Sequence, residues 1–139
     1  MIPPLSPYGL IQETLWPDEW RILVACVMLN CTTRRSVESV LPRFFDAYPD
    51  APTLARAERG DVEAIVSRLG FGTRRSKTLV DLARAYLTPD WTHARQLPGI
   101  GEYAAAAWDI FVRGVIPVDP PRDHALVAWW KWRKGLDEC

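Results

Sequence analysis

Prolines and glycines divide this chain into short segments, and nearly every segment carries apolar residues at helical spacing. The 139 residues include 12 prolines and 8 glycines, which end helices or permit turns. Between them, apolar side chains recur every three or four positions, as in Val37, Val40 and Phe44. Residues 115–118 come nearest to strand alternation, but the segment is too short and too close to prolines. These patterns predict an all-α fold of short helices.

The spacing and the capping residues place the expected helices along the chain. Asp18 can cap one helix and Thr32-Thr33 the next, Pro42 can kink a helix, and Pro89 stops another. The expected spans are 18–30, 34–48, 53–57, 61–69, 73–86, 93–96, 102–112 and 123–134, with a helical turn over 9–15.

The composition indicates a globular chain without deciding its partner. Hydrophobic residues make up 48%, enough to bury a core, and the 17 basic residues balance the 17 acidic ones. A neutral total can still contain a basic face, so the charge neither supports nor excludes a nucleic-acid partner. The three cysteines are an odd number without paired spacing, which disfavours a disulfide framework or a zinc site and favours a reducing compartment.

The sequence gives no sign of a membrane segment or a targeting signal. No apolar stretch approaches the roughly 20 residues that span a bilayer. The first residues are proline-rich and uncharged, unlike a secretory signal. We therefore expect a cytoplasmic protein without a membrane partner, associated with the nucleoid if the source is prokaryotic.

The segment Leu97-Pro98-Gly99-Ile100-Gly101 lies between two predicted helices and can form a hairpin. Its two glycines permit backbone geometry that side chains would block, and they let the main chain approach a ligand closely. From about Gly101 onward, the second helix would begin with unpaired N–H groups, which suit a phosphate together with the helix dipole. The alternative is a plain glycine turn between packed helices.

A carboxylate stands about twenty residues after the hairpin, at the predicted start of the last helix. Asp123 can be the N-cap of that helix, a role worth about 1 kcal/mol, and its position taken alone favours this. It can also be a carboxylate held in one place and kept ionised by the helix dipole. Such a group stabilises a cationic sugar transition state or activates a water. Asp119, made rigid by the prolines after it, is the competing carboxylate.

Together, the hairpin and Asp123 resemble the helix-hairpin-helix (HhH-GPD) DNA glycosylase superfamily. Its pattern is a Leu-Pro-Gly-x-Gly hairpin followed, after a similar interval, by an aspartate at a helix start. Within the superfamily, the glycosylase domain of the methyl-CpG-binding thymine DNA glycosylase is the closer match. The stretches that resemble it follow in the same order over nearly the whole chain: 10–15, 18–20, 29–32, 69–71, 75–78, 99–103 and 123–124.

The resemblance implies a single domain of two helical lobes with a DNA cleft between them. One lobe would span about 32–113, including the hairpin at 97–101, and the other would combine about 1–31 with 114–139. The implied function is that of a monofunctional, monomeric DNA glycosylase of base excision repair. It would flip a mispaired or modified pyrimidine out of double-stranded DNA and excise it. The expected substrates are thymine or uracil opposite guanine, or a 5-substituted uracil. The alternative is a helix-hairpin-helix module that binds DNA or senses lesions without catalysis.

The resemblance also assigns chemical roles. Asp123, in the pair Asp123-His124, would be the catalytic carboxylate, which makes Asp119 the less favoured choice. Tyr103 stands where bifunctional relatives carry a lysine. A phenol cannot form a Schiff base, so lyase activity is not expected. Tyr103 would be a wall of the base pocket, with a core residue near the hairpin as the alternative.

Two residues of the first helical turn would contact the base. Gln12 matches a glutamine that reads the pyrimidine edge, and an amide has both the donor and the acceptor for this. A solvent-facing glutamine is the alternative. The backbone of Ile11 would contact the same base.

Three positions depart from the thymine glycosylase pattern. Cys31 replaces an arginine that fills the gap left by the flipped base, so Arg34 or Arg35 would have to compensate. Gly72 replaces a pocket tyrosine, and Ala125 replaces a lysine. The lost side-chain volume suggests a roomier pocket and hence a pyrimidine with a larger 5-substituent.

The expected DNA contacts come from the hairpin and from other helix starts. Thr73, Arg74 and Arg75 form either a second phosphate contact or a solvated face, and His124 binds a phosphate or caps its helix. The full set is Cys31, Thr32, Arg34, Arg35, Gly72, Thr73, Arg74, Leu97, Pro98, Gly99, Ile100, Gly101 and His124.

No organic cofactor is expected. Iron–sulfur ligation by four cysteines cannot follow the last helix, because Cys139 is the sole cysteine there. No side-chain metal site is expected either. The hairpin of the family often holds a monovalent cation, and Na⁺ or K⁺ would here bind the carbonyls of Arg95, Leu97 and Ile100.

Overall fold

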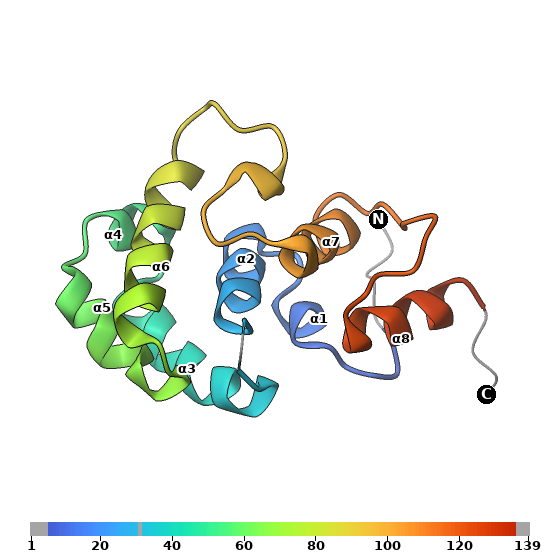
Figure 1. Cartoon of the computed structure of the whole chain (residues 1–139), viewed down its shortest axis with the longest axis horizontal. Coiled ribbons are helices and arrows are strands. Elements are labelled where there is room, and N and C mark those ends of the chain that lie inside the picture. The colour runs from blue at the N-terminus through green and yellow to red at the C-terminus, as the bar shows by residue number, and fades with distance from the viewer. Residues whose placement is uncertain (1–5, 31, 136–139) are drawn as a thin grey trace. The chain divides into compact units, whose positions relative to one another are not determined.

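The computed structural model describes residues 6–30 and 32–135, and every regular element among them is a helix (Figure 1). The predicted all-α fold is thereby confirmed. The described residues form two compact units, one of residues 6–26 and 101–135, the other of residues 27–30 and 32–100. The chain passes between them within α2 (Glu19–Met28) and again after Ile100.

The unit of residues 27–100 is organised around α6 (Gly72–Tyr86). This helix contacts α4 (Ala51–Ala55) and α5 (Arg59–Val66), and α5 in turn contacts α3 (Arg34–Ala47) (Figure 1). Apolar residues at helical spacing face inward and form the core. Its fully buried members include Val37, Phe44, Leu54, Val62, Leu79 and Leu82.

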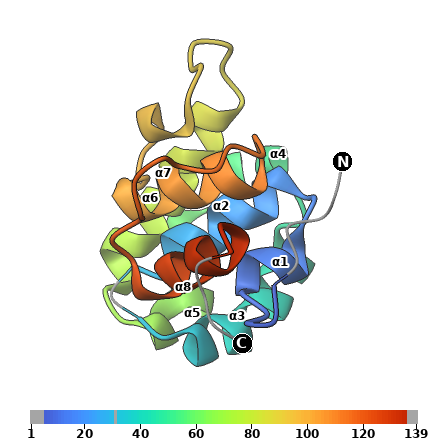
Figure 2. The same ribbon diagram turned by 90° about the vertical axis from the view of Figure 1, so that its right-hand side faces the viewer.

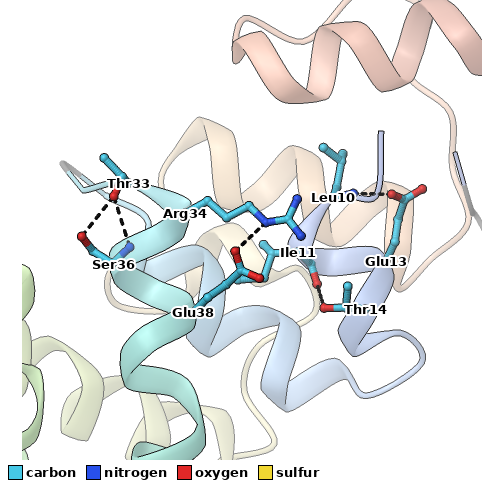
Figure 3. Close-up of polar contacts among 8 residues, drawn as sticks. All are labelled: Leu10, Ile11, Glu13, Thr14, Thr33, Arg34, Ser36 and Glu38. Carbon is cyan, nitrogen blue, oxygen red and sulfur yellow. Dashed lines mark hydrogen bonds and ion pairs between the residues drawn. The ribbon is translucent and has the colours of Figure 1, made fainter. Parts of the chain in front are cut away.

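A side-chain cap fixes where α3 begins. The Thr33 hydroxyl accepts a hydrogen bond from the Ser36 N–H at 3.2 Å, as predicted for a threonine at this position (Figure 3). From the first residue of α3, Arg34 Nε lies 3.0 Å from the Glu38 carboxylate one turn along the helix. Two 3-10 helices, η1 (Ser67–Leu69) and η2 (Ala94–Gln96), lie before α6 and before the hairpin.

The other unit contains α1 (Ile11–Leu15), the first part of α2, α7 (Glu102–Phe111) and α8 (His124–Arg133) (Figure 2). α1 contacts α7, and the Phe111 ring lies 5.4 Å from the Trp129 ring of α8. The Trp130 indole N–H donates to the Pro117 carbonyl at 2.7 Å, which ties the proline-rich connector to α8. Trp129 and Trp130 are buried, so packing accounts for both.

The short helix α1 is held in place by its own side chains. The buried Glu13 carboxylate accepts the backbone N–H groups of Ser6 and Leu10. Figure 3 shows the bond from Leu10 and the bond that the Thr14 hydroxyl donates to the Ile11 carbonyl at 2.6 Å. A five-residue helix has little stability of its own, so these bonds and its contact with α7 define it.

The expected helices are all present, and most ends differ by at most two residues; the helix expected over 61–69 is α5, which ends at Val66 and is followed by the 3-10 helix η1. The clearest shift is α4, expected over 53–57 and found over Ala51–Ala55. Asp50 caps it by accepting the Thr53 N–H at 2.9 Å, and Pro52 occupies the first turn, where a missing N–H costs nothing.

The bounds of the two units differ from the lobes expected at 32–113 and at 1–31 with 114–139. α7 belongs with the terminal segments, because it packs on α1 and, through Phe111, on α8. The chain passes from one unit to the other at residues 100 and 101, before α7, whereas the predicted lobe boundary lies after α7.

Over the described part of the chain, none of the helices has the length and apolar character needed to cross a membrane.

Candidate active site

Gly99 in the hairpin is required by the fold. Its φ of +80° is a conformation that side chains rarely adopt. A Cβ at this position would lie 2.5 Å from the Thr78 methyl group and 3.5 Å from Val27. The Ile100 N–H closes the turn on the Leu97 carbonyl at 3.3 Å, and both of these side chains are buried.

Gly101 differs from Gly99, because nothing in the fold demands a glycine there. Its φ of −90° and ψ of −165° are open to any residue, and a Cβ would meet no described atom within 4 Å. Gly101 is the N-cap of α7 and offers no side-chain cap, and the helical ladder begins with the Ala105 N–H on its carbonyl. The expectation that both glycines serve backbone geometry is therefore wrong for Gly101, which instead leaves the first turn of α7 uncovered.

Asp123 is the N-cap of α8, as the sequence predicted. Its Oδ2 accepts the Leu126 N–H at 3.0 Å, and its carbonyl accepts the Val127 N–H at 2.8 Å. The side chain is half-buried and fixed at one end only. Because a carboxylate can accept several hydrogen bonds, the cap leaves further acceptor capacity on Asp123.

A pocket of about 460 Å³ lies between the start of α7 and the start of α8. It brings Asp123 and Tyr103 to one concave surface, whereas Asp119 is exposed and does not line it. The lining residues are Glu102, Tyr103, Ala106, Pro120, Pro121, Arg122, Asp123 and Leu126. Of the two candidate carboxylates, the pocket therefore contains Asp123.

Tyr103 belongs to a buried hydrogen-bonded cluster with Gln12 and Cys26. The Gln12 side-chain amide donates to the Tyr103 hydroxyl and to the Cys26 sulfur, the latter at 3.5 Å. Gln12 is only 2% exposed and Cys26 is fully buried. The solvent-facing alternative for Gln12 is therefore wrong, and Tyr103 is both a pocket wall and a hydrogen-bond partner of the interior.

Burial keeps both ionisable members of this group neutral. Loss of water around the thiol raises the pKa of Cys26 to about 12; the Gln12 hydrogen bond opposes this shift and the Asp123 charge adds to it. Burial likewise raises the pKa of Tyr103 well above its usual value, with Cys26 and Asp123 contributing in the same direction. A neutral thiol and a neutral phenol are poor nucleophiles, so neither Cys26 nor Tyr103 offers an anion for chemistry.

Ile11, predicted to contact the base through its backbone, has a buried side chain. Its carbonyl already accepts the Thr14 hydroxyl at 2.6 Å. Any further contact of this carbonyl must use its second lone pair.

The unit of residues 27–100 has a second, smaller pocket beside the hairpin. Its volume is about 290 Å³, and Thr78, which contacts Gly99, is part of its wall. The complete lining is Val27, Asn30, Phe71, Arg74, Arg75 and Thr78. Arg74 and Arg75, both predicted as a possible phosphate contact, lie here.

Phe71 is a candidate contact that the sequence analysis missed. It is 66% exposed and adopts a left-handed conformation, with φ of +52°, directly before α6. Such a conformation is costly for a bulky residue and concentrates at functional positions. The available signal was an aromatic residue between Gly70 and Gly72 in a loop.

The expectation that Arg75 contacts a phosphate or lies on a solvated face is wrong. It is 6% exposed, and its guanidinium donates to main-chain carbonyls of two separate segments. The acceptors are Val27, Met28, Asn30, Leu69 and Gly70, at 3.0–3.4 Å. Arg75 therefore joins the end of α2 to the turn before α6 and is unavailable to DNA.

The other predicted DNA contacts of this unit lie at helix starts. The Thr73 hydroxyl donates to Glu63, and a Cβ on Gly72 would lie 3.3 Å from the same side chain. Arg35 is exposed and Thr32 is half-buried, while Arg34 pairs with Glu38. Cys31 lies outside the described residues.

Two further predictions concern α8 and metal binding. His124 is the exposed first residue of α8, next to the cap. In residues 6–30 and 32–135, no three His, Cys, Asp or Glu side chains are grouped to hold a metal ion. The carbonyl of Leu97, one proposed ligand of a monovalent cation, has a second lone pair beyond its bond to Ile100.

Comparison with known proteins gives the chain its family. The model of the "HhH-GPD superfamily base excision DNA repair protein" matches residues 24–137, most of the chain. The chain belongs to the HhH-GPD superfamily. A methyl-CpG-binding domain protein 4-like protein of Arabidopsis thaliana is 37% identical over 131 residues, covering 94% of this chain and 29% of that protein.

A thymine-DNA glycosylase of Aeropyrum pernix is 33% identical over 96 residues, covering 64% of this chain and 43% of that protein. A solved structure of a thermostable thymine-DNA glycosylase matches with a TM-score of 0.65 at 24% identity, covering 71% of this chain and 49% of the other, which supports the fold. The chain thus spans less than half the length of each curated relative.

Proposed function

We propose that this HhH-GPD chain is a monofunctional DNA glycosylase that excises thymine or uracil, or a 5-substituted uracil, opposite guanine. The observation that carries the proposal is the position of Asp123. Its carboxylate caps α8 through one oxygen and lines a pocket that Tyr103 also lines. A pocket with a fixed carboxylate and an aromatic wall suits a base turned out of the duplex.

Asp123 supports hydrolysis of the N-glycosidic bond. As that bond breaks, its electrons leave with the base and positive charge develops on the sugar, which the carboxylate stabilises. A water then attacks C1′ and passes a proton to Asp123 acting as a general base. The products are the excised base and an abasic site.

Strand cleavage through a Schiff base is not part of this proposal. No lysine is among the described residues that line the pocket. Tyr103 is a phenol held neutral by its raised pKa, and it cannot form an imine with the sugar.

The uncovered start of α7 binds a phosphate of the lesion strand. Gly101 lets the strand approach, and the N–H groups of the first helical turn donate to the phosphate oxygens. Within the unit of residues 27–100, exposed Phe71 and Arg74 offer DNA an aromatic and a cationic contact of their own. The carbonyls of Arg95, Leu97 and Ile100 would hold a Na⁺ or K⁺, which would supply positive charge to a phosphate beside the hairpin.

Gln12 gives the site a preference among pyrimidines. Its amide N–H groups are engaged by Tyr103 and Cys26, which leaves Oε1 as the atom for a base. Because Gln12 is 2% exposed and does not line the pocket, Oε1 reaches the base only once the Tyr103 side chain moves aside. That oxygen accepts a hydrogen bond from N3–H of thymine or uracil, whereas cytosine has no proton on N3. Uracil and thymine are therefore preferred over cytosine and 5-methylcytosine.

The direct test is base excision from duplexes that carry thymine, uracil, a 5-substituted uracil or cytosine opposite guanine. Abasic product is revealed by strand scission in hot alkali, and borohydride trapping reports any Schiff base. We expect product from thymine and uracil, none from cytosine, and no trapped adduct. Tight DNA binding without product on any pyrimidine would contradict the proposal and support a non-catalytic DNA-binding module.

A further inference from the structure

An ion pair spans the rim of the pocket that contains Asp123. Arg122 Nη1 lies 3.8 Å from the Glu102 carboxylate, and both residues line the pocket with Tyr103 and Asp123. The two partners come from different elements, one from the connector before α8 and the other from the first turn of α7. The pair therefore connects the two sides of the pocket.

This pair is easily opened. The side chains of Arg122 and Glu102 are 90% and 83% exposed, and the distance between them is at the long end for an ion pair. Exposed pairs of this kind change an equilibrium constant by no more than about fivefold. Arg122 can thus exchange Glu102 for another anion at small cost.

The rim also lies beside the groups assigned to the chemistry and to a phosphate. Arg122 directly precedes Asp123, and Glu102 is the first residue of α7, next to the N–H groups assigned to a phosphate. Glu102 alone would repel that phosphate. A guanidinium beside it neutralises this repulsion and offers a planar set of donors that matches phosphate oxygens.

We propose that Arg122 is a DNA phosphate-binding residue that Glu102 holds at the pocket rim until DNA arrives. When the nucleotide enters the pocket, Arg122 leaves Glu102 and binds a phosphate that flanks it. The inference rests on the proposed function, since it takes DNA as the ligand, but it concerns binding rather than excision.

The test is the salt dependence of binding to a duplex with a non-cleavable tetrahydrofuran abasic analogue opposite guanine, followed by fluorescence anisotropy. Each phosphate contact contributes about 0.9 to the slope of log K against log salt concentration. Arg122→Gln should reduce the slope by about that amount and weaken binding about tenfold at low salt. Glu102→Gln should tighten binding up to about fivefold and leave the slope unchanged, because Arg122 no longer has a competing partner.

Arg113→Gln is the matched control. Arg113 forms an ion pair with Asp109, at 3.0 Å and with side chains 48% and 20% exposed, at the opposite end of α7. It should leave the slope unchanged although it removes the same charge. If the wild-type protein binds the duplex and Arg122→Gln has the same salt slope as the wild type, the role of Arg122 is overturned and the proposed function is left intact. A wild-type protein that fails to bind the duplex would overturn both.

Discussion

The two units of this chain use their polar groups and glycines in different ways. In the unit of residues 27–100, the Arg75 guanidinium donates hydrogen bonds to main-chain carbonyls from both Nη atoms and from Nε. Gly99 has a positive φ and no room for a Cβ, so the fold requires glycine there. In the other unit, Asp123 is engaged at one oxygen, and Gly101 has no conformational or packing reason to be glycine. We infer that the first pair serves the fold, whereas the second pair serves a ligand.

The largest effect on stability should come from Arg75→Met. The substitution removes the donor from five main-chain carbonyls in a buried region, and each unsatisfied group carries a desolvation cost. We expect the free energy of unfolding to fall by about 3 kcal/mol or more, measured by urea denaturation. Arg74→Met, one residue away and exposed, is the control and should change it by less than about 0.5 kcal/mol. Equal effects of the two substitutions would contradict the structural role of Arg75.

Gly99→Ala should lower the free energy of unfolding by somewhat less than Arg75→Met. A methyl group at φ +80° is strained, and it would collide with the Thr78 side chain at 2.5 Å. We expect a loss of about 2 kcal/mol in the free energy of unfolding, of which Thr78→Ser should relieve a part by removing the colliding methyl group. A fully stable Gly99→Ala protein would show that the hairpin can adopt another conformation.

Alkaline pH should weaken the terminal unit through its buried thiol. The pKa of Cys26 is raised to about 12 in the folded protein, above the unfolded value near 9. The contribution of the protonated thiol to the free energy of unfolding is therefore fully present below about pH 9 and is lost as pH rises toward 12. The free energy of unfolding of the wild type should fall by about 1.4 kcal/mol per pH unit more than that of Cys26→Ala within this window. Parallel pH profiles for the two proteins would mean that the thiol ionises as readily in the folded state as in the unfolded one.

Gly101→Ala should have the smallest effect on stability and a clear effect on DNA. Nothing lies within 4 Å of the added methyl group, so the free energy of unfolding should change by less than about 0.5 kcal/mol. Duplex affinity should fall about tenfold, because the methyl group obstructs a phosphate at the N–H groups of α7. Gly101→Ala with wild-type affinity would remove the distinction between the two glycines.

The sequence sufficed for the helices and for the cap at Asp123, because periodicity and capping are local signals. It did not suffice for Arg75, whose acceptors come from residues 27–30 and 69–70, brought together only by the tertiary fold. The same reason hid the contact of Gln12 with Cys26 and Tyr103, which are far apart in the chain. The exposure of Phe71 depends on a left-handed backbone that its side chain disfavours, so composition alone gave no reason to expect it.

The central claim is that Asp123 carries the excision chemistry, and Asp123→Asn tests it most directly. Asparagine caps helices as well as aspartate, so α8 and the unfolding midpoint should be preserved. The rate of abasic-site formation on a G·T or G·U duplex should nevertheless fall by at least about 100-fold, because an amide neither stabilises a cationic sugar nor accepts a proton from water. Asp119→Asn, outside the pocket, should retain the wild-type rate. An Asp123→Asn protein that excises the base at the wild-type rate would contradict the account.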